Sequence, residues 1–216
     1  MKHMHRREFS TALLGASVLA AGLPAAAQGG PVEGTHYVRL GQPLPVTAPA
    51  GKVEVVEFFW YACPHCNAFE PKLEAWVKKI PADVAFRRVP VAFRDDMVPQ
   101  QRLFYALEAM GKLEDVHRKV FHAIHVEKQA LNREDLITAW VDKQGVDKAK
   151  FAELYNSFAV STKARKATQL QDAYRIEGVP SLGIAGRYLT SGDMAGTVDN
   201  ALLVTDYLIA EARKAK

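Results

Sequence analysis

The chain has 216 residues, of which 49% are hydrophobic and 24% are charged, so it can bury a full core and is not a disordered segment. Its length suits one domain, or one domain with an insertion. The formal net charge is +4, and no cluster of basic residues interleaved with aromatic ones is present, which argues against a nucleic acid partner.

The N-terminal residues have the organisation of a secretory signal. A basic stretch at 1–7 precedes an apolar run at 11–23, and three alanines follow at 25–27. The apolar run is shorter than the ~20 residues that cross a bilayer, so we expect cleavage near Ala27 and not a membrane anchor. The basic stretch also resembles a twin-arginine signal, and both the Sec and the twin-arginine routes stay open. Removing residues 1–27 leaves a formal charge of +2.

Strands are expected before the cysteines and a helix after them. A short strand is expected at 37–40, and a link rich in proline and glycine follows at 41–51. Residues 53–61 are β-branched and aromatic, which predicts a buried strand. A helical pattern then begins, with Pro64 at the first helical position, where its missing N–H costs nothing. Within this helix, Pro71 predicts a kink.

The two cysteines of the chain lie three positions apart, in Cys63-Pro64-His65-Cys66. As a structural disulfide this pair is weak, because stabilisation grows with the loop that a disulfide closes. A zinc site needs about four ligands, and His117, His122 and His125 offer only a scattered helical set. A c-type haem site requires histidine directly after the second cysteine, where this chain has asparagine. A redox role is therefore favoured.

The predicted helix start explains how the pair is activated. Cys63 falls at the N-cap, where its sulfur accepts backbone N–H groups and faces the positive end of the helix dipole. Both effects favour a thiolate, so the pKa of Cys63 is expected to fall. Cys63 is then the nucleophile and Cys66 the resolving thiol. His65, between them, is interpreted as tuning the sulfur with a further positive charge or donor.

The remaining elements follow in chain order. A strand is expected at 83–91, and helices at 100–110 and 113–127. Asn132 is expected to cap a helix that ends near Gly145, and further helices are expected at 147–158 and 161–176. Strands at 181–185 and 187–189 form a hairpin around Gly186, and an amphipathic helix at 197–214 ends the fold.

Residues 57–66, Glu-Phe-Phe-Trp-Tyr-Ala-Cys-Pro-His-Cys, resemble the centre of the DsbA-type disulfide oxidases of the thioredoxin superfamily. Downstream, Gly178-Val179-Pro180 and the strand after it are similar to the family's cis-proline loop. The resemblance implies an α/β, thioredoxin-like fold with an inserted all-helical domain. Residues 28–94 and 169–216 would form the thioredoxin-like part, and residues 95–168 the insertion.

The resemblance also implies roles for individual residues. Cys63 would form a mixed disulfide with substrate, and Val179 and Pro180, with a cis bond between them, would present backbone to an extended peptide. Strand alternation predicts that Glu57 is buried beneath the helix, where it would exchange a proton with Cys66. A structural salt bridge with Arg88 is the alternative for Glu57, and Arg88 itself departs from the lysine expected there.

The expected function is donation of the Cys63–Cys66 disulfide to unfolded, exported polypeptides with free cysteines in the periplasm. The family implies re-oxidation by a membrane quinone-linked partner of the DsbB type and no cofactor beyond the cysteine pair; no metal is expected. A reductase, a disulfide isomerase and a redox-inert peptide-binding chaperone are the alternatives. A DsbC-type isomerase carries an N-terminal dimerisation domain, which residues 28–51 are too short to supply, and a monomer is expected.

Overall fold

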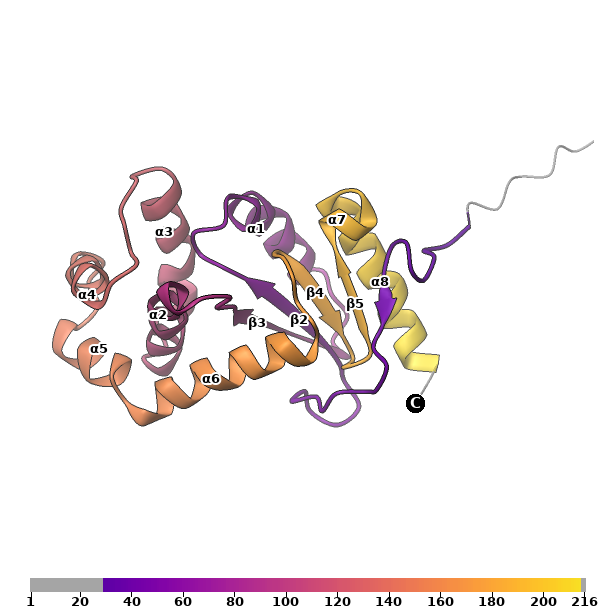
Figure 1. Cartoon of the computed structure of the whole chain (residues 1–216), viewed down its shortest axis with the longest axis horizontal. Coiled ribbons are helices and arrows are strands. Elements are labelled where there is room, and N and C mark those ends of the chain that lie inside the picture. The colour runs from indigo at the N-terminus through magenta and orange to yellow at the C-terminus, as the bar shows by residue number, and fades with distance from the viewer. Residues whose placement is uncertain (1–28, 215–216) are drawn as a thin grey trace, which may run out of the picture.

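The computed structural model describes residues 29–214, and the expected signal peptide at 1–27 lies outside that part of the chain. Among the described residues, no helix combines the length and apolar character needed to cross a membrane. Figure 1 shows a sheet with helices packed on it at one end of the molecule and a group of further helices at the other.

The sheet has five strands in the order β1-β5-β4-β2-β3. The central strand β2 pairs in parallel with β3 and antiparallel with β4. All seven residues of β2 are buried, because helices cover both faces of the sheet. The strands are β1 Val38–Arg39, β2 Val53–Phe59, β3 Val84–Pro90, β4 Ser181–Ile184 and β5 Tyr188–Ser191.

The helices fall into two groups. Three belong to the sheet: α1 Pro64–Val77 follows β2, and α7 Gly192–Ala195 and α8 Val198–Lys214 follow β5. The others lie between β3 and β4: the 3-10 helix η1 Asp95–Met97, α2 Val98–Ala109, α3 Leu113–His125, α4 Glu134–Lys143, α5 Lys148–Tyr155 and α6 Phe158–Ala173. The predicted fold class, an α/β sheet with a helical insertion, is confirmed.

The limits of the inserted domain remain a proposal. Residue 95 coincides with the start of η1, but residue 168 lies inside α6, which is one unbroken helix. Figure 1 shows α6 running from the helical end of the molecule back to the sheet. The helix therefore belongs to both parts, and a boundary at 168 divides the sequence more sharply than the structure does.

Two apolar clusters hold the molecule together, one on each face of the sheet. Val53 and Val55 of β2 pack with Leu73 of α1 and with apolar side chains of α8. Val56 and Phe58 point the other way, into a larger cluster that continues through α2 to α6. Because successive residues of a strand face opposite sides, one buried strand joins the two cores.

Two predicted helix boundaries are wrong. Asn132 does not cap α4; the N-cap position is Arg133, whose side chain makes no cap hydrogen bond and pairs with Asp135. The helices expected at 147–158 and 161–176 are divided differently, because Ser157 caps α6 through a hydrogen bond from Val160 N. Phe158 therefore begins α6 instead of ending α5. Apolar periodicity continues across this junction and does not reveal the cap.

The hairpin predicted around Gly186 is confirmed, with a backbone that explains the glycine. Ala185 and Gly186 both have positive φ, of 54° and 64°, as the two central residues of a type I′ turn require. A Cβ on Gly186 would lie 2.3 Å from the carbonyl oxygen of Leu44. Leu44 N in turn donates to Gly186 O at 2.8 Å, so the link at 41–51 is fixed to the hairpin.

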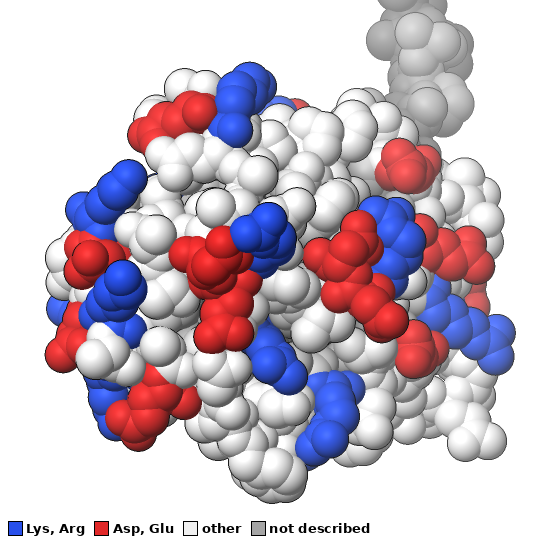
Figure 2. Space-filling view, turned by 60° about the vertical axis from the view of Figure 1, so that its left-hand side comes forward, with Lys and Arg blue, Asp and Glu red and all other residues white. Residues whose placement is uncertain are grey.

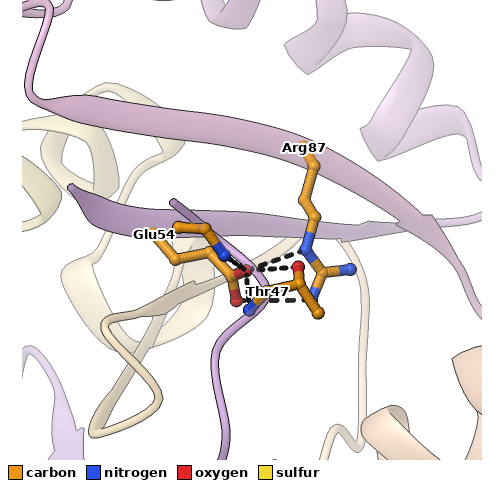
Figure 3. Close-up of polar contacts among 4 residues, drawn as sticks. Thr47, Glu54 and Arg87 are labelled. Atoms are coloured by element: carbon orange, nitrogen blue, oxygen red, sulfur yellow. Dashed lines mark hydrogen bonds and ion pairs between the residues drawn. The ribbon is translucent and has the colours of Figure 1, made fainter. Parts of the chain in front are cut away.

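A buried carboxylate fixes the same link to the sheet. Glu54 is 2% exposed, and its Oε1 accepts hydrogen bonds from Thr47 N at 2.8 Å and Thr47 Oγ1 at 2.7 Å. Arg87, on β3, donates to both carboxylate oxygens at 3.2 and 3.3 Å (Figure 3). Burial by itself would raise the pKa of Glu54, but the hydrogen bonds from Arg87 and then Thr47 outweigh it and lower the pKa.

We predict that Glu54→Gln lowers the free energy of unfolding by about 2 kcal/mol at neutral pH, because charge-assisted hydrogen bonds are lost. A carboxylate with a lowered pKa stabilises the fold above its unfolded pKa, and this contribution disappears as the pH falls through the folded value. The difference between wild type and variant should therefore shrink below the usual glutamate value of 4.5. Urea unfolding at a series of pH values measures it.

Glu33→Gln is the matched control, because the Glu33–Arg39 pair is about half exposed at 3.5 Å. Such a pair contributes little, so this substitution should change stability by less than ~1 kcal/mol. Equal effects of the two substitutions would contradict the assignment of Glu54 as a buried anchor.

Candidate active site

The cysteine pair lies where β2 gives way to α1. The chain turns between Trp60 and Cys63, with Cys63 N donating to Trp60 O at 3.0 Å, and α1 begins at Pro64. This turn ends β2 at Phe59, two residues earlier than predicted. Cys63 has the extended backbone of an N-cap, and its sulfur accepts a hydrogen bond from Cys66 N at 3.5 Å. The predicted capping role is confirmed.

The two sulfurs differ in both burial and ionisation. The pKa of Cys63 is lowered from 9.0 to about 6, first by a hydrogen bond from the Cys66 thiol, then by the backbone N–H groups of Cys66 and His65 and by the charge of His65. Burial raises the pKa of Cys66 well above its usual value, and Cys63 and Glu57 raise it further. The site therefore favours the thiolate form of Cys63 and the protonated thiol form of Cys66.

Exposure follows the same division. Cys63 is 7% exposed and Cys66 is fully buried, whereas Pro64 and His65 are exposed. Only the first sulfur is thus open to another molecule. His65 contributes to it through a backbone N–H and a nearby charge, from a side chain that faces solvent.

The loop before β4 completes this surface. The Val179–Pro180 peptide bond is cis, as predicted. Val179 O accepts a hydrogen bond from the Cys63 thiol at 3.4 Å, so two segments far apart in the sequence meet at the reactive sulfur. Pro180 is buried and Val179 is partly exposed, which leaves the backbone of this loop beside the sulfur at the protein surface.

Glu57 is fully buried on the α1 side of β2, as strand alternation predicts. Its Oε2 lies 3.2 Å from Arg88 Nε, so the ion pair considered as an alternative is present. Neither Glu57 oxygen has a well-aligned hydrogen-bond partner among the described residues. Burial, followed by the charge of Glu70, raises the pKa of Glu57 well above its usual value, against the effect of Arg88. The carboxyl group thus keeps its proton to a higher pH than an exposed glutamate does.

A larger buried network surrounds this pair, and the sequence analysis missed it. Arg88 Nη2 donates to Glu70 of α1, and His117 Nε2 of α3 lies 3.4 Å from Glu70 Oε1. Burial by itself would raise the pKa of Glu70, but His117 and Arg88 outweigh it and lower the pKa. Tyr61 joins the network through its hydroxyl, 2.8 Å from His117 Nδ1.

One signal could have revealed part of this network. Glu70 shares the inward face of α1 with Cys66, Phe69 and Leu73, and all four are buried. A carboxylate on an apolar helix face requires a buried partner.

No such signal in the sequence marked the histidines of α3. His117 and His125 lie against the active-site turn, whereas His122 is exposed. Within residues 29–214, no three His, Cys, Asp or Glu side chains are grouped as metal ligands.

Comparison with known proteins agrees with this geometry. The profile of the family described as "DSBA-like thioredoxin domain" matches residues 54–205. The chain is 43% identical over 211 residues to the thiol:disulfide interchange protein DsbA of Burkholderia cepacia, covering 98% of this chain and 99% of that protein. It is 44% identical over 210 residues to the protein of the same name in Bordetella pertussis, covering 96% and 97% of the two chains.

Solved structures give the same result. The crystal structure of Pseudomonas aeruginosa DsbA superposes with a TM-score of 0.80 at 44% identity, covering 84% of this chain and 94% of that one. The oxidoreductase NmDsbA1 of Neisseria meningitidis gives a TM-score of 0.75 at 29% identity, covering 85% and 95%. The chain therefore belongs to the DsbA-like thioredoxin family and is a thiol:disulfide oxidoreductase that forms disulfide bonds.

Proposed function

We propose that the chain transfers the Cys63–Cys66 disulfide to unfolded, exported polypeptides with free cysteines. Cys63 is the sulfur that substrate attacks and the nucleophile of the reverse reaction, and Cys66 is the resolving thiol. The observation that carries this proposal is the difference between the two sulfurs: the pKa of Cys63 is lowered to about 6, and that of Cys66 is raised. A sulfur that is stable as an anion is a good leaving group, so the disulfide is a strong oxidant.

The exchange takes two steps. A substrate thiolate attacks Sγ of Cys63, the Cys63–Cys66 bond breaks, and Cys66 leaves and takes up a proton. A second substrate thiolate then attacks the substrate sulfur of the mixed disulfide, and Cys63 departs as a thiolate. The substrate loses two electrons, and the cysteine pair gains them. Pro64 starts α1 directly after Cys63, so the N–H groups that stabilise the departing anion are already in place.

Two further groups serve these steps. Glu57, whose raised pKa lets it hold a proton, gives that proton to Cys66 as it leaves and takes it back when Cys66 attacks in reverse. Val179 and Pro180 place the backbone of their loop beside Sγ of Cys63, where an extended substrate can lie against it. Contact between Val179 O and the sulfur supports this assignment.

The proposal includes the setting of the reaction. The leader at 1–27 supports export to the periplasm, and the family supports re-oxidation by a membrane quinone-linked protein of the DsbB type. The cysteine pair itself carries the electrons, so the chemistry needs no further cofactor or metal. On the face in Figure 2, basic side chains are interspersed with acidic ones, which supports a protein and not a nucleic acid partner. We propose that the protein acts as a monomer.

The lowered pKa of Cys63 favours an oxidase over a reductase, because it stabilises the dithiol form. An isomerase would use the same residues, and a chaperone would need none of the sulfur chemistry. Loss of turnover in Cys63→Ser separates an enzyme from a chaperone, and the relative stability of the two redox forms separates an oxidase from a reductase.

Cys63→Ser should abolish oxidation of a peptide with two free cysteines, because no sulfur remains to form the mixed disulfide. Cys66→Ser has no internal disulfide to donate and should also fail to oxidise the peptide. Given glutathione disulfide, its Cys63 thiolate should attack that bond, release one glutathione thiolate and accumulate a mixed disulfide with glutathione, visible by mass spectrometry, because no second thiol resolves it. Loss of thiol in the peptide measures turnover. Full biological function in the Cys63→Ser variant would support the chaperone alternative instead.

The reduced protein should be more stable than the oxidised one at neutral pH. Because the folded pKa of Cys63 is below its unfolded value, the thiolate stabilises the fold fully above pH 9.0, and this contribution fades as the pH falls through about 6. Urea unfolding of both redox forms across this range measures the difference. Reduced Cys63→Ser protein is the control, and it should lack this pH dependence. An oxidised form that unfolds less readily than the dithiol contradicts the oxidase assignment.

Glu57→Gln should slow the attack of Cys66 on a mixed disulfide at Cys63 by about a hundredfold, because a general base is lost. The deficit should shrink as the pH rises, since the solvent then removes the proton. A stopped-flow measurement of mixed-disulfide resolution gives both results. Glu54→Gln, a buried carboxylate on the same strand with partners of its own, is the matched control. A deficit that does not change with pH would assign Glu57 to the structural ion pair with Arg88.

A further inference from the structure

Tyr61 occupies the turn that carries Cys63 into position. It is the first of the two residues between Trp60 and Cys63, whose backbones are hydrogen-bonded across the turn at 3.0 Å. Its side chain is 1% exposed, and its ring packs against Phe59 and Phe121 with centroids 5.0 and 5.1 Å away. Tyr61 thus attaches the turn to the core, together with Trp60 and Cys63, which pack on the same cluster.

Two histidines of α3 hold Tyr61 at two different atoms. His117 Nδ1 lies 2.8 Å from the Tyr61 hydroxyl, and His125 Nε2 lies 2.8 Å from the Tyr61 carbonyl oxygen. A carbonyl oxygen only accepts hydrogen bonds, so Nε2 of His125 carries the hydrogen. His117 faces the carboxylate of Glu70 with Nε2, which places its hydrogen there and leaves Nδ1 to accept from the Tyr61 hydroxyl.

Both histidines are themselves fixed. His117 is 4% exposed and packs edge to face with Phe59 and Phe121. His125 stacks on Phe121 with an interplanar angle of 24°. The aromatic cluster therefore encloses His117, whereas the partly exposed His125 packs on one side of it.

The position of this turn matters for the reactive sulfur. Sγ of Cys63 is 3.5 Å from Cys66 N and 3.4 Å from Val179 O. The first contact stabilises the anion, and the second places the sulfur beside the loop at residue 179. Since hydrogen bonds weaken steeply with distance and angle, a small displacement of the turn would weaken the stabilisation of the thiolate.

We propose that His117 and His125 are positioning residues of the disulfide exchange, which hold Tyr61 by its hydroxyl and its carbonyl oxygen and thereby keep Sγ of Cys63 on the N–H groups of α1. The inference rests on the proposed role of Cys63 as the leaving group. It gives α3, from the inserted helices, a part in setting the oxidising strength of the cysteine pair. Neither histidine touches the reacting atoms.

A positioning role is distinguishable from a structural one by the redox equilibrium. The equilibrium constant with glutathione reports the difference in stability between the dithiol and disulfide forms. A purely structural hydrogen bond supports both forms equally, so its loss leaves this constant unchanged. A bond that supports the thiolate of Cys63 supports the dithiol form more, so its loss makes the protein less oxidising.

The experiment compares variants of His125 on the full mature protein. His125→Leu removes the donor to Tyr61 O, whereas His125→Gln keeps an N–H at a similar distance from the backbone. His122→Gln is the control, because His122 is exposed on the same helix and pairs only with Glu127 among the described residues. Tyr61→Phe tests the His117 contact separately, by removing the hydroxyl alone. Ultraviolet titration of the Cys63 thiolate and equilibration with glutathione are measured on each.

We expect His125→Leu and Tyr61→Phe each to raise the pKa of Cys63 by about half a unit to one unit, and to shift the glutathione equilibrium roughly 3- to 10-fold toward the disulfide form, as the loss of one hydrogen bond implies. His125→Gln and His122→Gln should match the wild type. If His125→Leu folds poorly, Tyr61→Phe still tests the positioning of the turn, through the His117 contact.

Two results would overturn the inference. One is an unchanged pKa and equilibrium constant in both His125→Leu and Tyr61→Phe. The other is a His125→Gln variant that behaves like His125→Leu. The wild-type titration separates this failure from failure of the proposed function: if Cys63 in the wild type titrates near its usual 9.0, the role of Cys63 itself is wrong. If it titrates near 6 and only the variants show no effect, the positioning role alone is wrong.

Discussion

The structure depends on the contact between one sulfur and the start of one helix. Cys63 caps α1, and the Cys66 thiol, followed by the N–H groups of the first turn, lowers its pKa to about 6. Part of this stabilisation comes from a neighbouring side chain, and part comes from backbone groups that a helix start leaves unpaired. It therefore exists wherever the turn before α1 and the helix itself are held in place. Much of the surrounding structure serves that requirement.

The buried groups below α1 show how such a site tolerates charge in an apolar interior. Arg88 lies between Glu57 and Glu70, so one cation faces two carboxylates in the core. The pKa of Glu70 is lowered, and burial and Glu70 raise that of Glu57. The arrangement thus shifts the pKa values of two carboxyl groups on neighbouring elements in opposite directions. Glu57, whose pKa is raised, also raises the pKa of the Cys66 thiol.

The helices between β3 and β4 do more than extend the core. α3 contacts the active-site turn through His117 and His125, and α6 brings the chain back to the sheet, where the ring of Tyr174 packs on Phe58 at 5.1 Å. A Cβ on Gly183 of β4 would lie 2.5 Å from that ring, so the glycine makes room for it. Through these contacts the inserted helices support both the turn that carries Cys63 and the strand that follows Val179.

Local signals in the sequence were sufficient for the central strand, the capping cysteine and the hairpin at Gly186, because each depends on residues only a few positions apart. They did not reveal the turn at 60–63, which ends β2 two residues early. The same signals misplaced the caps of α4 and α6, where apolar periodicity runs past the helix ends. Only the tertiary structure decided the partners of Glu57, Glu70 and Tyr61 and the contact of Cys63 with Val179 O. These pairs join side chains from different elements, and no periodicity along the chain encodes which residues meet across the core.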